Sequence, residues 1–442
     1  MNAFETVQLS NSSKQRLVVL VGYYYLTNPI YYALREQLSD FEVIYYFPKD
    51  IIGADINYAS DERVDLLKND LNYCELDYDP PWFCLRRSYW YNRSFLSKFW
   101  MWVKTVFTVS YYSRRVLNDI STLKPSAVLC TSDIFYVPRL IEEYMPNIPL
   151  FVLQPSFLDL REKSARFQSA KYLVNKVISR LFENQPYFGM ECRSSNLLVW
   201  GEKTYDYYAG RRSNVFRVVN PAHKALRDEV GKLRTAGRNL ILSKLKLSFE
   251  RKTIVIFVDH FETLYDESFQ DRYESCCIEM LKFLQRTFNV IIKTHPNGDI
   301  KYWRQLFAQD IGEAACVIRD VEKAELMAVC DIAIATNSYA LVEAAIGGSV
   351  SINFFPGEEV NEVDSREGIT KCYAHNAKSV ESLLEFVGYL ANNARLEECQ
   401  RFSVAAVNHL FFPEKNTENF EKLLLSAICS GSQIKQCRDH MV

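Results

Sequence analysis

The chain has 442 residues, more than one hydrophobic core of ordinary size accommodates, so two domains of about 200 residues each are expected. Its formal net charge of −2 excludes the overall basic field of a nucleic-acid-binding protein, and no partner of that class is expected. The 12 cysteines include no C-x-x-C pair, which is typical of a reduced cytoplasmic protein and argues against a disulfide framework or a zinc site.

The first 16 residues lack the apolar core of a signal peptide, and no uncharged apolar run reaches the length of a membrane span. A cytoplasmic location is therefore expected.

Continuous apolar runs alternate with helical segments along the first half of the chain. The run at 16–22 is typical of a strand buried on both faces, and a helix is expected from about 28 to 38. Residues 50–95 break this rhythm and are interpreted as an insertion. The strands predicted in this half cover 16–22, 41–47, 126–130, 148–153 and 196–200, with helices from about 134 and 201.

Residues 223–252 are charged and helical in pattern, and they are interpreted as a passage between the domains. The alternation then restarts. The strands predicted in the second half cover 253–258, 289–293, 315–318, 331–335 and 349–354. The helices predicted there begin at about 273 and 339 or cover 301–309, 322–330 and much of 378–430.

Strands that alternate with helices predict an α/β protein with two doubly wound parallel sheets. We assign residues 1–222 to an N-terminal Rossmann-like domain, 253–410 to a C-terminal one and 411–442 to a helical tail. Ligands of such sheets bind outside the carboxyl ends of the strands, so the residues directly after predicted strands are the candidates for function.

The segment Lys293-Thr294-His295-Pro296-Asn297 follows a predicted strand. Proline fixes its own backbone and restricts the residue before it, so His295 leaves the strand in a defined direction. Its imidazole could donate to a phosphate oxygen, with Lys293 adding positive charge. The alternative is that Pro296 only ends the strand and His295 is an incidental loop residue.

A second polar segment, Thr336-Asn337-Ser338, follows the strand predicted at 331–335. Ser338 or Asn337 is a natural N-cap for the next helix, and hydroxyls and free amides there suit a phosphate. Glu343, one turn on, could accept both hydroxyls of a ribose, and the glycines at 347–348 end the helix. The alternative is a plain helix cap with Glu343 as a solvated charge.

Asp259 and His260 directly follow the strand predicted at 253–258. A carboxylate there could act as a base, a nucleophile or an orienting group, and a helix-capping role is the equal alternative. The candidates for the acceptor or donor-sugar side are His260 and, in the first half, Gly22, Tyr23, Asp133, Arg139 and Gln154, each of which could instead be structural.

Residues 87–115 combine bulky aromatic side chains with Arg and Lys at both ends. The segment fits peripheral contact with anionic lipid head groups, or a buried helix of the first domain. Elsewhere the sequence contains neither G-x-G-x-x-G nor G-x-x-x-x-G-K-[ST], which argues against hydride transfer and P-loop ATP hydrolysis.

Four segments in this order resemble the GT-B glycosyltransferases that build bacterial surface polysaccharides. They are SNLLVWGEKTYDYY (195–208), VVNPAHKAL (218–226), KTHPN (293–297) and TNSYALVEAAIGGSVSINF (336–354). The resemblance is closest to the retaining β-Kdo transferases, which use CMP-activated sugars. It implies two Rossmann-like domains whose parallel sheets face each other across a cleft.

For function, the resemblance implies sugar transfer, with Kdo from CMP-Kdo as the donor of choice, to a glycan or lipid-linked glycan at the cytoplasmic face of the inner membrane. It implies that His295 contacts the CMP phosphate with support from Ser338, that Glu343 holds the ribose, and that Asp259 is the catalytic carboxylate. No cofactor or metal is expected, since no Asp-x-Asp triad follows a predicted strand.

Similar His-Pro and Ser/Thr signals occur in teichoic-acid glycerophosphate transferases and in UDP-N-acetylglucosamine 2-epimerases. Both classes stay open as alternatives, as does a non-catalytic nucleotide-sugar-binding subunit of a polysaccharide assembly complex.

Overall fold

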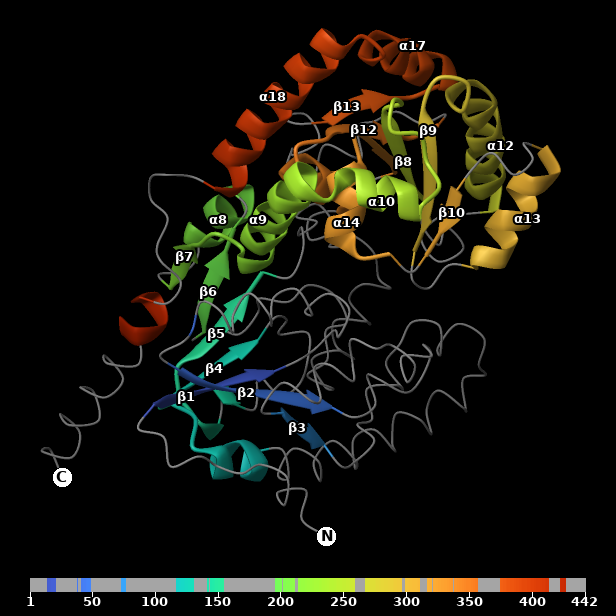
Figure 1. Ribbon diagram of the computed structural model, residues 1–442. Coiled ribbons are helices and arrows are strands. Elements are labelled where there is room, and N and C mark those ends of the chain that lie inside the picture. The colour runs from blue at the N-terminus through green and yellow to red at the C-terminus, as the bar shows by residue number, and fades with distance from the viewer. Residues whose placement is uncertain are drawn as a thin grey trace, which may run out of the picture. The chain divides into compact units, whose positions relative to one another are not determined.

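The computed structural model of the chain (Figure 1) describes residues 14–20, 38, 41–48, 73–76, 117–130, 141–142, 144–154, 195–200, 202–210, 214–258, 267–295, 299–310, 316–319, 321–336, 338–356, 374–412 and 422–426. These residues divide into two compact units. The first unit holds the described residues up to Pro221 together with the helix at 422–426, and the second unit holds those from Ala222 to Phe412.

The first unit contains a seven-stranded sheet in the order β3-β2-β1-β4-β5-β6-β7, in which all neighbouring strands are parallel. Its strands are β1 (Gln15–Leu20), β2 (Phe41–Pro48), β3 (Tyr73–Leu76), β4 (Ala127–Cys130), β5 (Leu150–Leu153), β6 (Asn196–Val199) and β7 (Val215–Arg217). Residues 117–123 are helical, and α8 (Glu202–Ala209) follows β6. Leu17, Val18 and Val19 of β1 are fully buried, which explains the continuous apolar run of this central strand.

The second unit contains a six-stranded parallel sheet in the order β10-β9-β8-β11-β12-β13. Its strands are β8 (Thr253–Val258), β9 (Asn289–Thr294), β10 (Cys316–Ile318), β11 (Ile332–Ala335), β12 (Val350–Phe354) and β13 (Ala374–Ala377). Counted along the chain, this is the 3-2-1-4-5-6 order of a Rossmann sheet, and the first unit has the same order with one strand added. The predicted pair of parallel Rossmann-like sheets is confirmed.

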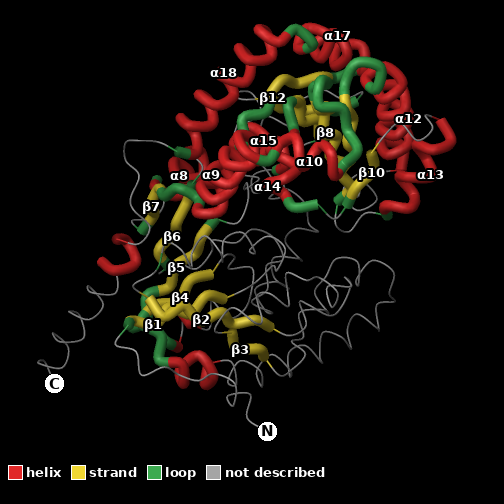
Figure 2. The backbone as a smooth tube through the Cα atoms, in the orientation of Figure 1, coloured by secondary structure: helices red, strands yellow, loops and turns green. Residues whose placement is uncertain are grey.

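The helices of the second unit alternate with its strands as predicted (Figure 2). They are α9 (Pro221–Ala236), α10 (Arg238–Lys244), α12 (Glu267–Leu284), α13 (Ile300–Asp310), α14 (Lys323–Val329), α15 (Ala340–Ile346), α17 (Val380–Leu390) and α18 (Asn393–Phe411). Helix α12 begins six residues before the predicted start at Tyr273. Its extra turn places Phe269 one turn before Tyr273, and both rings are buried.

Three strands were not predicted, namely β3, β7 and β13. The sequence-based interpretation of 50–95 as an insertion is wrong for residues 73–76, which pair with β2 as an outer strand of the first sheet. This pairing also corrects the statement that no Asp-x-Asp triad follows a strand, because Asp77-Tyr78-Asp79 comes directly after β3 in the chain.

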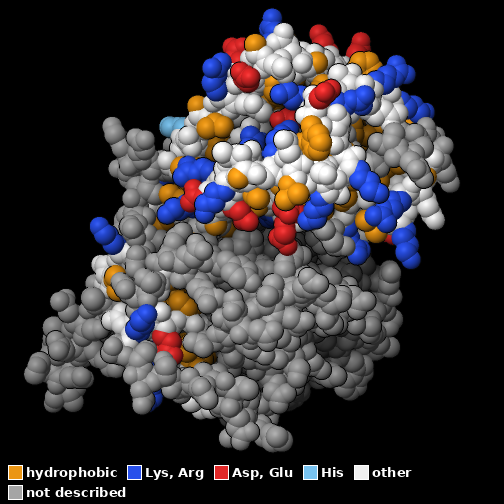
Figure 3. Space-filling view, viewed as in Figure 1, with side chains coloured by type: hydrophobic (Ala, Val, Ile, Leu, Met, Phe, Trp, Pro, Cys, Tyr) orange, Lys and Arg blue, Asp and Glu red, His pale blue; other side chains and the backbone are white. Residues whose placement is uncertain are grey.

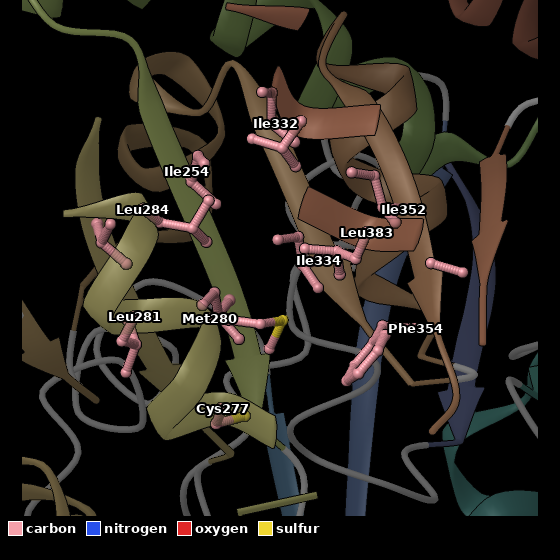
Figure 4. Packing of buried hydrophobic residues seen from close by; sticks show 14 of the residues in the cluster. Ile254, Cys277, Met280, Leu281, Leu284, Ile332, Ile334, Ile352, Phe354 and Leu383 are labelled. Atoms are coloured by element: carbon pink, nitrogen blue, oxygen red, sulfur yellow. The ribbon is translucent and has the colours of Figure 1, made fainter. Parts of the chain in front are cut away.

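The main core of the second unit lies between one face of its sheet and the helices α12, α13 and α17 (Figure 4). Alternate residues of the strands, such as Ile254, Ile334 and Ile352, point toward Met280 and Leu383 on these helices. All five side chains are buried, and each stabilises the unit by about 1.5–3 kcal/mol through removal from water.

Small residues occupy the opposite face of the strands, where α15 packs on β11 and β12. Ala333 of β11 is fully buried, and the Ser351 hydroxyl of β12 donates to the Leu341 carbonyl of α15 at 2.7 Å. Ala344 and Ala345 of α15 are also fully buried. This close approach fixes α15 directly against the end of β11.

The segment interpreted as a passage between the domains is bound to the second unit. The Arg234 guanidinium of α9 donates to the Cys330 carbonyl at 2.7 Å and to the Gly348 carbonyl at 3.3 Å. Arg238 of α10 donates to Asp331 at 2.7 Å, and Asp331 also accepts the Thr253 amide at 2.8 Å. The helical character predicted for 223–252 is found in α9 and α10. The second of these helices, α10, ends at Lys244.

On the face of the second unit seen in Figure 3, Lys and Arg side chains are interspersed with Asp and Glu side chains. None of the helices in the described ranges is both long enough and apolar enough to cross a bilayer.

Candidate functional site

The segments of the second unit that were predicted to bind a ligand follow the carboxyl ends of three adjacent strands, β8, β9 and β11. Strand β8 is central and pairs with β9 on one side and β11 on the other, and Val258 stands opposite Thr294. From β8 the chain order runs outward in both directions, which makes this edge the point where ligands of doubly wound sheets bind.

His295 leaves β9 at this edge in a fixed register. Its backbone amide donates to the Val258 carbonyl at 3.0 Å, which extends the ladder between β8 and β9 by one bond. The His295 side chain is half-buried. Lys293, two residues earlier, is also half-buried, and its ammonium group donates to the Thr294 carbonyl at 2.9 Å. The structure thus places two partly exposed residues, His295 and Lys293, at the end of β9.

Two of the predicted ligand-binding hydroxyls bind the sheet itself. Thr294 Oγ1 donates to the Ile318 carbonyl at 3.4 Å, and Thr336 Oγ1 donates to the Phe354 carbonyl at 2.7 Å. Both threonines are buried. Each hydroxyl donates its proton to the end of the neighbouring strand. In this structure the two hydrogen bonds therefore stabilise the carboxyl edge of the sheet.

The turn after β11 leads into α15, as predicted. The Ser338 hydroxyl accepts the Ala340 amide at 3.3 Å, and the Ser338 carbonyl accepts the Leu341 amide at 3.1 Å. The amides of Val342 and Glu343 donate to the Tyr339 carbonyl. The amides at 340–343 are therefore occupied by the turn, and the expectation of free amides for a phosphate does not hold for these four residues.

Glu343 lies in the first turn of α15 and faces α14. Its Oε1 accepts a hydrogen bond from Lys323 Nζ at 2.6 Å. The Glu343 side chain is 12% exposed and the Lys323 side chain 46% exposed. The sequence predicted Glu343 as a ligand-binding carboxylate, whereas nothing in its pattern indicated Lys323, because the two helices are joined only by the fold.

His223 is a further residue of this region, and it was not predicted as a site residue from the sequence. It lies in the first turn of α9, and its Nε2 shares a hydrogen bond with the Tyr339 hydroxyl at the start of α15. The imidazole stacks on the Tyr339 ring at 5.7 Å and meets Phe411 of α18 edge-on at 5.5 Å. Full burial, with a smaller contribution from the positive charge of Lys323, lowers the pKa of His223 to about 3. A neutral histidine thus anchors the turn between Thr336 and α15.

A sequence signal for His223 does exist. Pro221 is the first residue of α9, where proline is favoured because no helical partner is needed for its missing amide proton. The histidine two residues later is therefore predicted to lie in the first turn of a helix. In the structure this turn contacts the start of α15 through Tyr339.

In the first unit, Gln154 has a structural role. Its side chain is fully buried, donates to Thr204 Oγ1 at 3.3 Å and accepts the Trp200 amide at 3.1 Å. Its carbonyl accepts from the Trp200 indole at 2.8 Å. These contacts join the end of β5 to the β6–α8 connection, which is the structural role that the sequence left open for Gln154.

The remaining predicted site residues and the segment 87–115 lie outside the described residues. They are Gly22, Tyr23, Asp133, Arg139, Asp259, His260, Pro296, Asn297 and Asn337. Within the ranges that the structure does describe, no three His, Cys, Asp or Glu side chains gather as a group that could hold a metal ion.

No protein-family model matches the sequence, and no curated protein matches it. Solved structures match over almost the whole chain at low sequence identity. A UDP-GlcNAc 2-epimerase from Neisseria meningitidis bound to UDP-GlcNAc is 13% identical with a TM-score of 0.54, covering 94% of this chain and 100% of its own.

Two further solved structures match over a similar length. A glycosyltransferase from Rickettsia africae is 12% identical with a TM-score of 0.52, covering 96% of this chain and 98% of its own. Arabidopsis thaliana UGT89C1 complexed with UDP is 9% identical with a TM-score of 0.53, covering 95% and 100%. Together with the two Rossmann-type sheets, these matches show a GT-B fold.

Proposed function

We propose that this protein is a nucleotide-sugar-dependent glycosyltransferase whose second unit binds the nucleotide. The observation that supports this most is the convergence of His295 with the Ser338–Glu343 turn at the ends of strands that flank β8. Two of the matched structures are bound to UDP-GlcNAc or UDP. The same class of ligand is proposed for this protein.

In the proposed complex, His295 and Lys293 lie beside the phosphate and Glu343 accepts from the ribose hydroxyls. Positive charge and hydrogen-bond donors at the end of β9 would stabilise the negative charge that develops on the leaving phosphate. Asp259, directly after β8 in the chain, is the proposed catalytic carboxylate. The first unit would present the acceptor.

For the donor and acceptor we propose Kdo from CMP-Kdo and a surface glycan or lipid-linked glycan. The support is the resemblance of the segments at 195–208, 218–226, 293–297 and 336–354 to the β-Kdo transferases. Contact of the aromatic segment 87–115 with the inner membrane, at its cytoplasmic face, belongs to the same proposal.

The first experiment is a thermal-shift panel with CMP, UDP, GDP, ADP and CDP-glycerol. A ligand at about 100 times its Kd adds about 2.7 kcal/mol to the unit that it binds. For a unit of this size the expected rise is about 5–10 °C. A rise with CMP alone supports a CMP-linked donor, a rise with UDP alone overturns it, and no rise with any nucleotide overturns the proposed function.

The role of His295 is tested by His295→Ala. Loss of a donor that stabilises a leaving phosphate is expected to lower kcat by about 100-fold or more. His409→Ala, an exposed histidine on α18, is the matched control and should leave turnover unchanged. Full turnover by His295→Ala would show that the phosphate is stabilised by other groups.

The proposed reaction needs no metal ion, and this is open to direct test because Asp77 and Asp79 follow β3. Turnover should persist in EDTA and in Asp77→Asn and Asp79→Asn. Activity that is lost in EDTA, restored by Mg²⁺ or Mn²⁺ and lost again in both variants would establish a metal-dependent reaction instead.

A second candidate, a UDP-N-acetylglucosamine 2-epimerase, is favoured by the match to the Neisseria meningitidis enzyme. An epimerase needs no acceptor. Release of an epimerised free sugar from UDP-GlcNAc alone would decide for this candidate, whereas transfer to an added glycan would decide for the transferase.

A further inference from the structure

The ion pair between Lys323 and Glu343 joins the first turns of two helices at the carboxyl edge of the second sheet. Lys323 is the first residue of α14, and Glu343 is the fourth of α15. Their contact, from Nζ to Oε1, is 2.6 Å long. These residues are 20 positions apart and belong to helices that follow different strands, β10 and β11.

The bond is made to one carboxylate oxygen only. Among the described residues, Lys323 is the sole hydrogen-bond partner of the Glu343 side chain, and it donates to Oε1. Glu343 Oε2 thus keeps its acceptor capacity at a side chain that is still 12% exposed. A carboxylate fixed through one oxygen is suited to accept from a ligand through the other.

The lysine also compensates the charge of the carboxylate. A nucleotide brings at least one phosphate charge to this sheet edge, and an unpaired carboxylate nearby would repel it. With Lys323 in place, Glu343 offers an oriented acceptor without adding net negative charge. A Glu343 carboxylate that accepts hydrogen bonds without repelling a phosphate suits an anionic ligand that carries hydroxyl groups.

We propose that Lys323 is a positioning residue for Glu343, and that the pair selects ribonucleotides over 2′-deoxyribonucleotides. This inference rests on the proposed binding of a nucleotide at this edge. Lys323 holds Oε1, and Oε2 accepts from the vicinal hydroxyls of the ribose. A 2′-deoxyribose leaves one of these hydrogen bonds unmade.

The test is isothermal titration with UDP, CMP and their 2′-deoxy forms. The full-length wild-type protein is expected to bind the ribonucleotide about 10-fold more tightly or better, as for a hydrogen bond to a charged acceptor. In Lys323→Met and in Glu343→Gln the preference should fall to within about two-fold. Lys323→Arg should restore most of it.

The matched control is Lys244→Met, which removes an ion pair from the same helix. Lys244 Nζ lies 3.0 Å from Glu325 Oε2 of α14, and this pair does not include Glu343. The preference for ribose should be unchanged in this variant. Thermal denaturation of each variant distinguishes a loss of fold from a loss of selectivity.

Two outcomes overturn the inference in different ways. Equal binding of ribo- and deoxyribonucleotides by the wild type, or a preference retained in Lys323→Met, overturns the role of the pair and leaves the proposed function standing. Binding of none of the probes overturns this inference, and it overturns the proposed function as well when no nucleotide of the thermal-shift panel binds either.

Discussion

His223 is buried between two aromatic rings in the second unit, where an imidazolium would be poorly solvated. Its pKa is lowered to about 3 from an ordinary value of 6.5. Between these two values the unfolded chain binds a proton that the folded protein does not. Stability therefore rises with pH across this window and is lost as the pH falls below about 6.5.

We expect the free energy of unfolding to fall by up to about 1.4 kcal/mol for each pH unit below 6.5, through this group alone. Chemical denaturation of wild type and His223→Gln between pH 4 and 8 measures it, since the variant should have the shallower pH dependence. His409→Gln, at an exposed position, is the control. Identical pH slopes in wild type and His223→Gln would show that His223 binds its proton equally well in the folded and the unfolded protein.

The Arg238–Asp331 pair is a second contact whose contribution to stability can be measured with a single substitution. Asp331 is buried and accepts both Arg238 and the Thr253 amide. Removal of Arg238 leaves a buried carboxylate without its cation, so Arg238→Met is expected to cost about 3 kcal/mol.

The exposed pair between Lys244 of α10 and Glu325 of α14 serves as the control. Lys244→Met should cost less than about 1 kcal/mol, because water screens this pair. Urea denaturation of both variants gives the comparison. Equal losses would mean that solvent solvates Asp331 once Arg238 is gone.

Among the elements, α15 shows how a short helix is held by its ends and by one small-residue face. It ends at Ile346, and Gly348 then adopts a positive φ of 84°. A Cβ atom at Gly348 would lie 3.0 Å from Arg234 Nη1, the same guanidinium that binds the Gly348 carbonyl. The sequence predicted that this glycine pair ends the helix, and the structure confirms it.

Gly348→Ala is expected to destabilise the protein by at least about 1 kcal/mol, since alanine is strained at positive φ and Arg234 must move. Gly388→Ala in α17 is the opposite case, because a Cβ atom there meets nothing within 4 Å. That substitution should stabilise by about 0.5–1 kcal/mol. Thermal unfolding of the two variants should therefore shift Tm in opposite directions, and a stabilising Gly348→Ala would contradict the strain.

The strands that were missed are short strands at the outer ends of the two sheets. Inner strands such as β8 and β11 are covered on both faces and flanked on both edges, so their sequences are continuous apolar runs. The three missed strands β3, β7 and β13 are outer strands with three or four residues each. An outer strand buries less surface, so its composition carries a weaker signal. Among the four outer strands of the two described sheets, only β10 was predicted.

At the scale of the whole molecule, the two units are expected to unfold as separate transitions, because each has its own sheet and its own buried residues. Leu383→Ala removes a side chain from the core of the second unit and should cost about 2–5 kcal/mol there. Calorimetry should show one transition lowered by about 5–15 °C and the other unmoved.

Leu198→Ala, at a fully buried position of β6, should lower the other transition instead. A nucleotide that binds at the proposed site should raise the transition that Leu383→Ala lowers. A single transition that responds equally to both substitutions would show that the two units unfold together.

The sequence by itself determined the fold class, the inner strands of both sheets and the position of His295 and Ser338 after two of these strands. It could do so because buried strands must be apolar, and because polar residues directly after them have to lie at the carboxyl edge. Local pattern also placed the end of α15 at Gly347-Gly348, since a positive φ favours glycine.

Only the tertiary structure decided which side chains meet at that edge. Lys323 reaches Glu343 from another helix, and His223 reaches Tyr339 across 116 positions of the chain. It also assigned Thr294, Thr336 and Gln154 to hydrogen bonds within the protein, where the sequence offered a ligand role. The physical reason is that a polar side chain takes whichever partner the packing brings within reach, and packing depends on residues far apart in the sequence.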